Sequence, residues 1–249
     1  MSGHSKWSQI KRQKGANDTK RGAVFTKVGR EIAIAARAGG GDPDANFRLR
    51  LAIEKARSVN MPADNITRAI ERAAGGDKAD EYEEIVYEGY GPGGVAVLVE
   101  AAINNRNRTA GDVRSIFTRA GGSLAGGGSV AWQFEPVGLI SVPRGGHDAD
   151  EVALVAIDVG ATDVDTESDP LEISTSPGDL EAVRKGLEAA GIKVESGEIT
   201  MRPKSTVEID GAHVRQNLRM IDSLDDLEDV QRVTANFDLP DDVLEEASA

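Results

Sequence analysis

The sequence predicts an α+β protein in which an N-terminal helical bundle is followed by two ferredoxin-like βαββαβ domains, the third domain being inserted within the second. Three observations lead to this prediction. Apolar residues recur at helical spacing up to Gly76, strand-like apolar runs alternate with helical segments after it, and one βαββαβ order lies between two outer βαβ pieces. The predicted domains are a basic helical domain at 1–76, a split α+β domain at 77–135 plus 204–240, an inserted ferredoxin-like α+β domain at 136–203 and an acidic tail at 241–249.

Three amphipathic helices are expected in the first domain. The first spans Lys20–Ala38 and is ended by the glycines at 39–41. Asp42 and Pro43 are expected to start the second helix, with the aspartate as N-cap and the proline at the first helical position. The third begins at Pro62 and stops at the glycines at 75–76. Because short amphipathic helices cannot bury their apolar faces alone, they should pack as a small bundle.

The remaining chain reads as alternating strands and helices. The first outer piece has strands at 82–88, 95–103 and 130–134 with a helix at 109–120, and the second has a strand at 207–209, a helix at 212–223 and a strand at 233–237. The inserted unit has strands at 138–142, 161–165, 171–174 and 192–199 with helices at 150–159 and 178–190. A simple linear series of domains is the competing arrangement.

The charge of the chain is divided unevenly. Residues 1–75 carry 15 Lys/Arg against 7 Asp/Glu, a net charge of +8, whereas the remaining residues have a net charge of −21. A concentrated positive region attracts a polyanion, and the acidic remainder keeps the rest of the molecule away from it. A solvated, Lys-rich helical segment is the simpler interpretation, and the sequence favours nucleic acid over it.

The candidate nucleic-acid contacts lie mainly at the N-terminus. The residues expected to contact phosphates are Lys6, Lys11, Arg12, Lys14, Lys20, Arg21, Lys27 and Arg30. Trp7 could stack on an unpaired base or pack against the first helix. No helix-turn-helix with identifiable base-reading side chains can be named.

A second basic stretch, Asn104-Asn105-Arg106-Asn107-Arg108-Thr109, links an apolar strand to an amphipathic helix. It is either a capped turn, with Asn or Thr capping the helix, or part of a second basic patch. The patch would contain Arg106, Arg108, Arg114 and Arg119. Arginine suits a phosphate or a carboxylate, including one in another domain of the same protein.

Other classes of function find no support in the sequence. Gly89–Gly94 has the spacing of a dinucleotide-binding loop, but it precedes a strand instead of a helix, so a β-hairpin turn is expected. The three histidines are far apart, and the acidic stretches lack the glycine and glutamate of calcium loops. We therefore expect no catalytic site, no metal, no cofactor and no small-molecule substrate. The absence of cysteine and of a long apolar run predicts a cytoplasmic protein without a membrane partner.

Several motifs resemble the YebC/PmpR family over essentially the whole chain. They are GHSKW at 3–7, IKRQKGANDTKRGAVFTKVGREI at 10–32, SVNMP at 58–62, EGYGPGG at 88–94, NNRNRT at 104–109, GGSLAGGGSV at 121–130 and LRMIDSLDD at 218–226. Ala125 stands where the family more usually has glycine. The resemblance implies a helical first domain followed by two α+β domains, the third inserted in the second.

The resemblance also implies a regulator of gene expression. Bacterial members are usually described as DNA-binding transcriptional regulators, whereas a mitochondrial relative is a translational activator and bacterial relatives have been linked to the ribosome. The first expectation is therefore a DNA-binding transcriptional regulator. The alternative is a translational activator that binds RNA or the ribosome.

Overall fold

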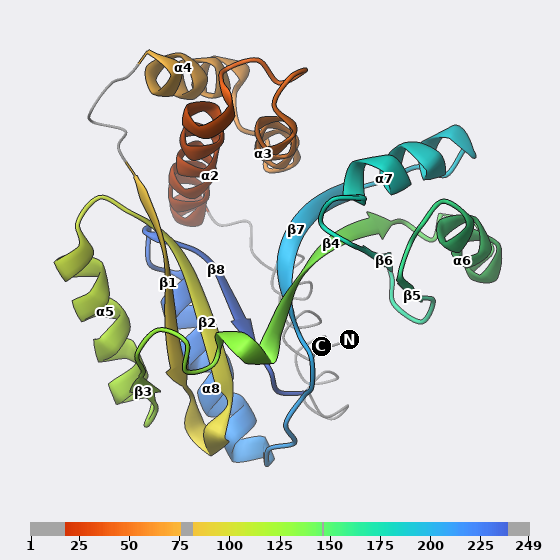
Figure 1. The fold of residues 1–249 in the computed structure, drawn as a ribbon. Helices are drawn as coiled ribbons and strands as arrows, with labels where there is room; N and C mark the ends of the chain where they lie inside the picture. Colours follow the sequence, from red (N-terminus) through yellow and green to blue (C-terminus); the bar gives the residue numbers. More distant parts are fainter. Residues whose placement is uncertain (1–17, 76–81, 146, 239–249) are drawn as a thin grey trace. The chain divides into compact units, whose positions relative to one another are not determined.

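The computed structural model describes residues 18–75, 82–145 and 147–238, and these divide into two compact units (Figure 1). One unit comprises Met1–Gln133 together with Pro203–Ala249, and the other comprises Phe134–Arg202. The described part of the chain contains three N-terminal helices, two four-stranded antiparallel sheets and four further α-helices. The predicted α+β class is confirmed.

The N-terminal helices are α2 (Asp18–Gly39), α3 (Phe47–Ser58) and α4 (Ala63–Ala74). They pack around a core of small aliphatic side chains that includes Val28, Ile32, Ala35, Leu49, Ile53, Ile66 and Ala69. Because alanine fills many of these positions, the helices can lie close together despite their few large apolar residues.

The start of α3 differs from the prediction. Asn46, not Asp42, is the N-cap, and its Oδ1 accepts from the backbone N–H of Leu49 at 3.1 Å. The Asn46 Nδ2 also donates to the carbonyl oxygens of Ala35 and Gly40, at 2.8 Å each, so the same side chain ties α3 to the end of α2. Asp42 instead forms a turn by accepting from the N–H of Asp44. Both aspartate and asparagine can cap a helix, and the contacts with α2 select Asn46.

In the same unit, β1 (Glu83–Tyr90) and β2 (Ala96–Ile103) form an antiparallel hairpin. A short 3₁₀ turn, η2 (Pro92–Gly94), joins them, and Gly93 has a φ of +77° that favours glycine. The hairpin turn expected for the glycine-rich motif is thus confirmed. Together with β3 (Ser123–Leu124) and β8 (Val230–Ala235), these strands form a sheet in the order β3-β1-β2-β8.

Two helices, α5 (Arg106–Arg119) and α8 (Gly211–Asp225), pack against this sheet. Alternate residues of β2, from Val97 to Ile103, lie in one core cluster with apolar residues of both helices. Strand side chains alternate between the two faces of a sheet, so α5 and α8 cover the same face.

Two segments of this unit that were predicted as strands adopt other conformations. Val130–Phe134 alternates like a strand, yet residues 131–133 form a 3₁₀ turn, η3 (Ala131–Gln133). The chain here surrounds the buried carboxylate of Glu88, which accepts the backbone N–H groups of Gly128, Val130 and Ala131 at 2.6–2.8 Å. Burial alone would raise the pKa of Glu88, but these N–H donors outweigh it and lower the pKa. The predicted strand at 207–209 is a single parallel bridge between Val207 and Phe237.

The second unit contains β4 (Phe134–Val142), α6 (Ala149–Asp158), β5 (Asp163–Asp165), β6 (Leu171–Thr175), α7 (Leu180–Ala189) and β7 (Ser196–Pro203). Its sheet has the order β5-β6-β4-β7, so a βαββαβ chain folds into one antiparallel sheet. Its buried residues include Ile140, Val142, Ala156, Leu171, Ile173, Leu180 and Leu187.

The residues that flank the second unit on either side are in contact with each other. The backbone N–H of Lys204 donates to the carbonyl oxygen of Gln133 at 2.8 Å, and the Lys204 Nζ donates to the carbonyl of Trp132 at 2.9 Å. The first unit therefore closes on itself at the point where the second unit leaves and returns.

We expect that replacing Phe134–Arg202 with a short Gly/Ser linker leaves the first unit folded, because the residues to be joined are already in contact. Retained cooperative thermal unfolding and slow hydrogen exchange in β2 and β8 would support the nested arrangement. Disappearance of both would contradict it.

Candidate nucleic-acid interface

The structure describes only part of the predicted interface. Lys6, Trp7, Lys11, Arg12 and Lys14 lie outside the described residues. Lys20 and Arg21 belong to the first turns of α2, and their side chains also lie outside the described part of the protein. The phosphate contacts assigned to these residues remain predictions.

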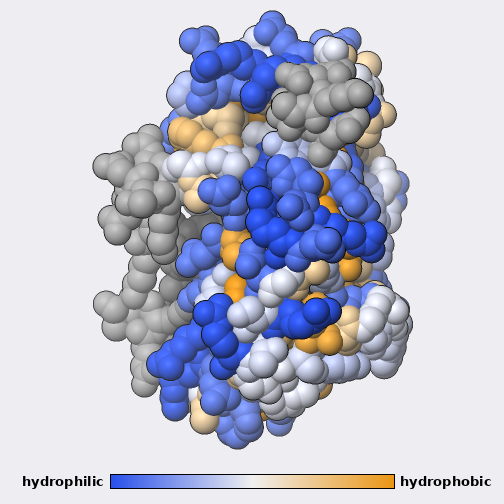
Figure 2. All heavy atoms as spheres, turned by 90° about the vertical axis from the view of Figure 1, so that its left-hand side faces the viewer, coloured by the Kyte–Doolittle hydropathy of each residue, from blue (hydrophilic) through white to orange (hydrophobic). Residues whose placement is uncertain are grey.

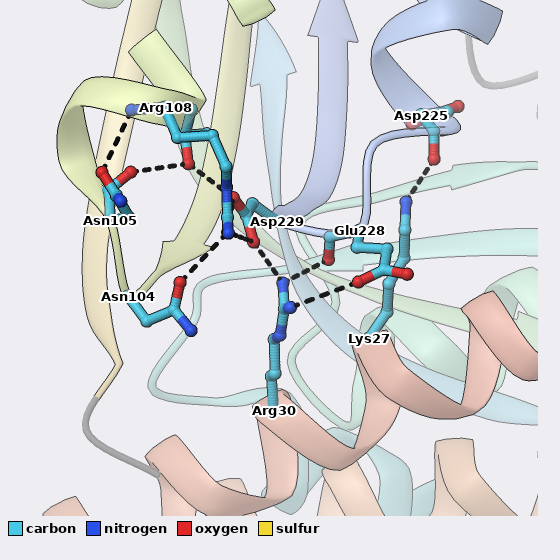
Figure 3. A network of polar contacts seen from close by, with 9 residues as sticks. Lys27, Arg30, Asn104, Asn105, Arg108, Asp225, Glu228 and Asp229 are labelled. Atoms are coloured by element: carbon cyan, nitrogen blue, oxygen red, sulfur yellow. Dashed lines mark hydrogen bonds and ion pairs between the residues drawn. The ribbon is translucent and has the colours of Figure 1, made fainter. Parts of the chain in front are cut away.

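Two predicted phosphate contacts on α2, Lys27 and Arg30, are engaged within the protein (Figure 3). The Lys27 Nζ donates to the backbone carbonyl of Asp225, at the end of α8. The Arg30 Nη1 donates to the carbonyl oxygen of Glu228 at 2.6 Å and to the carboxylate of Asp229 at 2.7 Å. Arg30 is only 7% exposed, because its guanidinium is paired with a carboxylate inside the protein. We therefore no longer count Arg30 among the residues expected to contact phosphates.

Asp229 is the centre of a buried polar network (Figure 3). Its carboxylate accepts from the Arg30 guanidinium on α2, from the Arg108 Nη2 at 2.9 Å and from the Thr109 hydroxyl at 2.5 Å, both on α5. Its backbone carbonyl accepts the N–H of Ala102 on β2 at 2.8 Å. Burial raises the pKa of Asp229, but the hydrogen bonds from Thr109 and Arg108 and the charges of both arginines outweigh burial and lower it.

The stretch at 104–109 combines features of both interpretations left open by the sequence. Asn105 caps α5, its Oδ1 accepting the N–H of Arg108 at 3.1 Å, as a capped turn requires. Arg108 meanwhile finds a carboxylate partner in its own chain, Asp229, and its side chain stays 52% exposed. Arg106 is exposed and lies 3.9 Å from Glu83. Arg108 is therefore paired with Asp229, and about half of its side chain remains exposed to solvent.

A groove between α2 and α4 is a feature that the sequence did not predict. It has a volume of about 440 Å³. Its lining residues are Phe25, Thr26, Gly29, Arg30, Ala33, Met61, Asn65, Arg68, Ala69, Arg72 and Tyr82. The sequence contains one indication of this groove, the pair Arg68 and Arg72, whose spacing of four places both on one face of α4. That face becomes part of a groove only because α2 packs beside it.

Neither a metal site nor a membrane span appears in the part of the chain that is described. No three His, Asp or Glu side chains there are close enough to share a metal ion. None of the helices there is both long and apolar enough to cross a bilayer.

The Asp229 network predicts a large effect from a small change. Asp229→Asn should lower the free energy of unfolding by about 3–5 kcal/mol, because it leaves the buried Arg30 without its counter-charge. Glu228→Gln is the matched control. Its carboxylate is 67% exposed and 3.7 Å from Arg30, so the decrease should stay below about 1 kcal/mol. Chemical denaturation of both variants measures the difference, and equal effects would contradict a central role for Asp229.

The same network predicts a pH dependence. The pKa of Asp229 is lowered in the folded protein, so its stabilising contribution is present above the unfolded-state pKa and is lost as pH falls through the folded-state value. The stability gap between wild type and Asp229→Asn should therefore narrow below about pH 4. Denaturation of both proteins across a pH series measures the gap, and a gap that stays constant down to acid pH would contradict an ionised Asp229.

Comparison with known proteins identifies the family. Residues 5–76 match the model of the TACO1/YebC protein N-terminal domain, and residues 82–237 match that of the TACO1/YebC second and third domain. A probable transcriptional regulatory protein of Rubrobacter xylanophilus is 52% identical over 249 residues, which is 100% of both chains. One of the same description from Moorella thermoacetica is 53% identical over 99% of both chains.

A solved structure agrees with these matches. The crystal structure of a conserved hypothetical protein from Aquifex aeolicus superimposes with a TM-score of 0.83 and 45% sequence identity, covering 90% of this chain and 92% of that one. The resemblance inferred from the sequence motifs is confirmed. With family models matching both its N-terminal region and residues 82–237, and relatives aligned along its full length, the chain belongs to the TACO1/YebC family.

Proposed function

We propose that this protein regulates gene expression by binding nucleic acid through its basic N-terminal region, with duplex DNA as the first target. The observation that carries the proposal is the separation of charge, +8 over residues 1–75 against −21 over the rest. Phosphate neutralisation by Lys and Arg supplies most of the affinity of nucleic-acid-binding proteins, so the positive region is the expected contact.

The described helices add exposed cationic side chains to this region. Those of α2, α3 and α4 include Arg37, Arg57, Arg68 and Arg72, whereas Arg48 is paired with the Glu84 carboxylate. On the face shown in Figure 2, outside the grey atoms, hydrophilic side chains cover most of the surface and hydrophobic ones form small separate patches. This face therefore shows no large continuous apolar patch of the kind at which an apolar partner would dock.

The choice of DNA rests on the relatives, which are named probable transcriptional regulatory proteins. The alternative is a translational activator that binds ribosomal or other structured RNA. It is favoured by the lack of a recognisable base-reading helix, since structured RNA is bound through shape and backbone contacts. In either case we propose a cytoplasmic protein that acts without catalysis.

The role of the N-terminal arm can be tested by charge reversal. Lys11→Glu combined with Arg12→Glu should weaken binding to nearly all sequences equally, because phosphate contacts do not read bases. The slope of log affinity against log salt should flatten by about 0.7–0.9 for each phosphate that the variant no longer neutralises. Lys193→Glu combined with Arg215→Glu is the matched control, with the same charge change on exposed residues outside 1–75. If both double variants behave alike, the arm is not the interface.

The nature of the target is tested by two measurements on the same protein. A transcriptional regulator should select one duplex sequence from a random pool, typically with a preference of about 10³ or more over bulk duplex. A ribosome-associated factor should enrich no duplex motif and should co-sediment with ribosomes in an arm-dependent way at moderate salt. The second pattern would replace DNA by RNA as the target.

A further inference from the structure

We infer that the groove between α2 and α4 holds one unpaired nucleotide of the bound nucleic acid, with its base on the groove floor and its phosphate on Arg68 and Arg72. This inference rests on the proposed binding of nucleic acid by the basic region. It deepens that proposal by naming the recognised feature, a nucleotide that is unpaired within an otherwise paired DNA or RNA.

The floor of the groove suits a flat, mostly apolar ring. Phe25, Gly29 and Ala33 contribute from α2, while Met61 and Ala69 contribute from the opposite side and Tyr82 from the chain before β1. The volume of about 440 Å³ lies within the range of small-ligand pockets, which is about 300–1,000 Å³. Aromatic and aliphatic side chains together can hold a base by stacking and apolar contact, with little dependence on its identity.

Gly29 places no side chain on the part of the floor that it lines, so this part of the groove stays open. It lies in the interior of a long helix, where glycine costs about 1 kcal/mol relative to alanine. A Cβ added there would meet no described atom within 4 Å, so packing within the described protein does not require glycine. Close approach of a ligand to the helix backbone is a use of glycine that fits this position.

The rim of the groove is cationic. Arg68 and Arg72 are exposed on α4, and no acidic residue is among the described residues that line the groove. The Arg68 Nη2 donates to the Asn65 Oδ1 at 2.5 Å and its Nε donates to the Asp64 carbonyl at 3.1 Å, which fixes the plane of the guanidinium. Arg30 also lines the groove, but its guanidinium is engaged by Asp229 and Glu228, so the phosphate contact is assigned to Arg68 and Arg72 alone. A planar arginine fork is suited to a phosphate.

An unpaired nucleotide fits this combination better than a paired one. In a duplex the bases are stacked inside, so only phosphates could reach the rim and the apolar floor would remain empty. A bulged or looped nucleotide presents its base and its phosphate together, which is how single-stranded sites are usually recognised.

The test compares two hairpins, made as DNA and as RNA, that differ only by one bulged 2-aminopurine nucleotide. Wild-type protein should bind the bulged hairpin about tenfold more tightly, as expected for one stacked base, with a change in 2-aminopurine fluorescence. Gly29→Leu should abolish this preference by filling the groove while keeping the affinity for the paired hairpin. Gly22→Leu is the matched control, since Gly22 is also a helical glycine with open space around it but does not line the groove.

A second variant keeps the test decisive if Gly29→Leu does not fold. Arg68→Gln combined with Arg72→Gln should also remove the preference, whereas Lys193→Gln combined with Arg215→Gln, two exposed cations outside both basic regions, should not. Equal binding of both hairpins by wild type, or a preference that survives Gly29→Leu, would overturn the inference and leave the proposed function standing. Binding of neither hairpin would overturn both. If a polyglutamate peptide, but no hairpin, binds in a Gly29→Leu-sensitive way, the groove takes an acidic peptide instead.

Discussion

The carboxylate of Asp229 joins three elements that are far apart in the sequence, since it accepts hydrogen bonds from Arg30 on α2 and from Arg108 and Thr109 on α5, directly before β8 begins. Burying an isolated carboxylate and an isolated guanidinium would each cost several kcal/mol, and mutual pairing with additional hydrogen bonds offsets that cost. Neither Arg30 nor Asp229 could be buried here without the other. The helical bundle is therefore attached to the first sheet by an ion pair in which each buried charge is balanced by the other.

This network changes how the charge of the N-terminal region is interpreted. Arg30 adds to the formal net charge of residues 1–75, yet its charge is balanced by Asp229 from the acidic part of the chain. Lys27 likewise donates to the carbonyl of Asp225. Cations of α2 thus hold the protein together, while exposed cations such as Arg68 and Arg72 remain on the surface of α4. Within one basic segment, some cations can therefore stabilise the fold while others remain on the surface to bind a ligand.

A second buried carboxylate organises the glycine-rich stretch. Glu88 accepts the backbone N–H groups of Gly128 and Val130, in the irregular segment after β3, and of Ala131 at the start of η3. Buried backbone donors need such a partner, because leaving one unsatisfied costs about 1–3 kcal/mol. The glycines before Val130 allow the chain to wrap around the carboxylate. In both cases an acidic side chain from one element fixes the position of another.

Periodicity in the sequence was enough to determine the helices α2 and α4, the β1–β2 hairpin and the βαββαβ order of the second unit, because local burial patterns repeat at 3.6 or 2 residues. The family followed from motifs, and the positive region followed from charge counting. Three features depended on tertiary contacts. Asn46 and not Asp42 caps α3, and residues 130–133 surround the Glu88 carboxylate instead of forming a strand. The third feature is the groove, which exists because α2 and α4 pack side by side. Whether an arginine binds phosphate or an internal carboxylate was likewise decided by which acid folding brought close to it, as for Arg30 and Asp229 at 2.7 Å. Such pairings join residues about two hundred positions apart, and no local pattern encodes them.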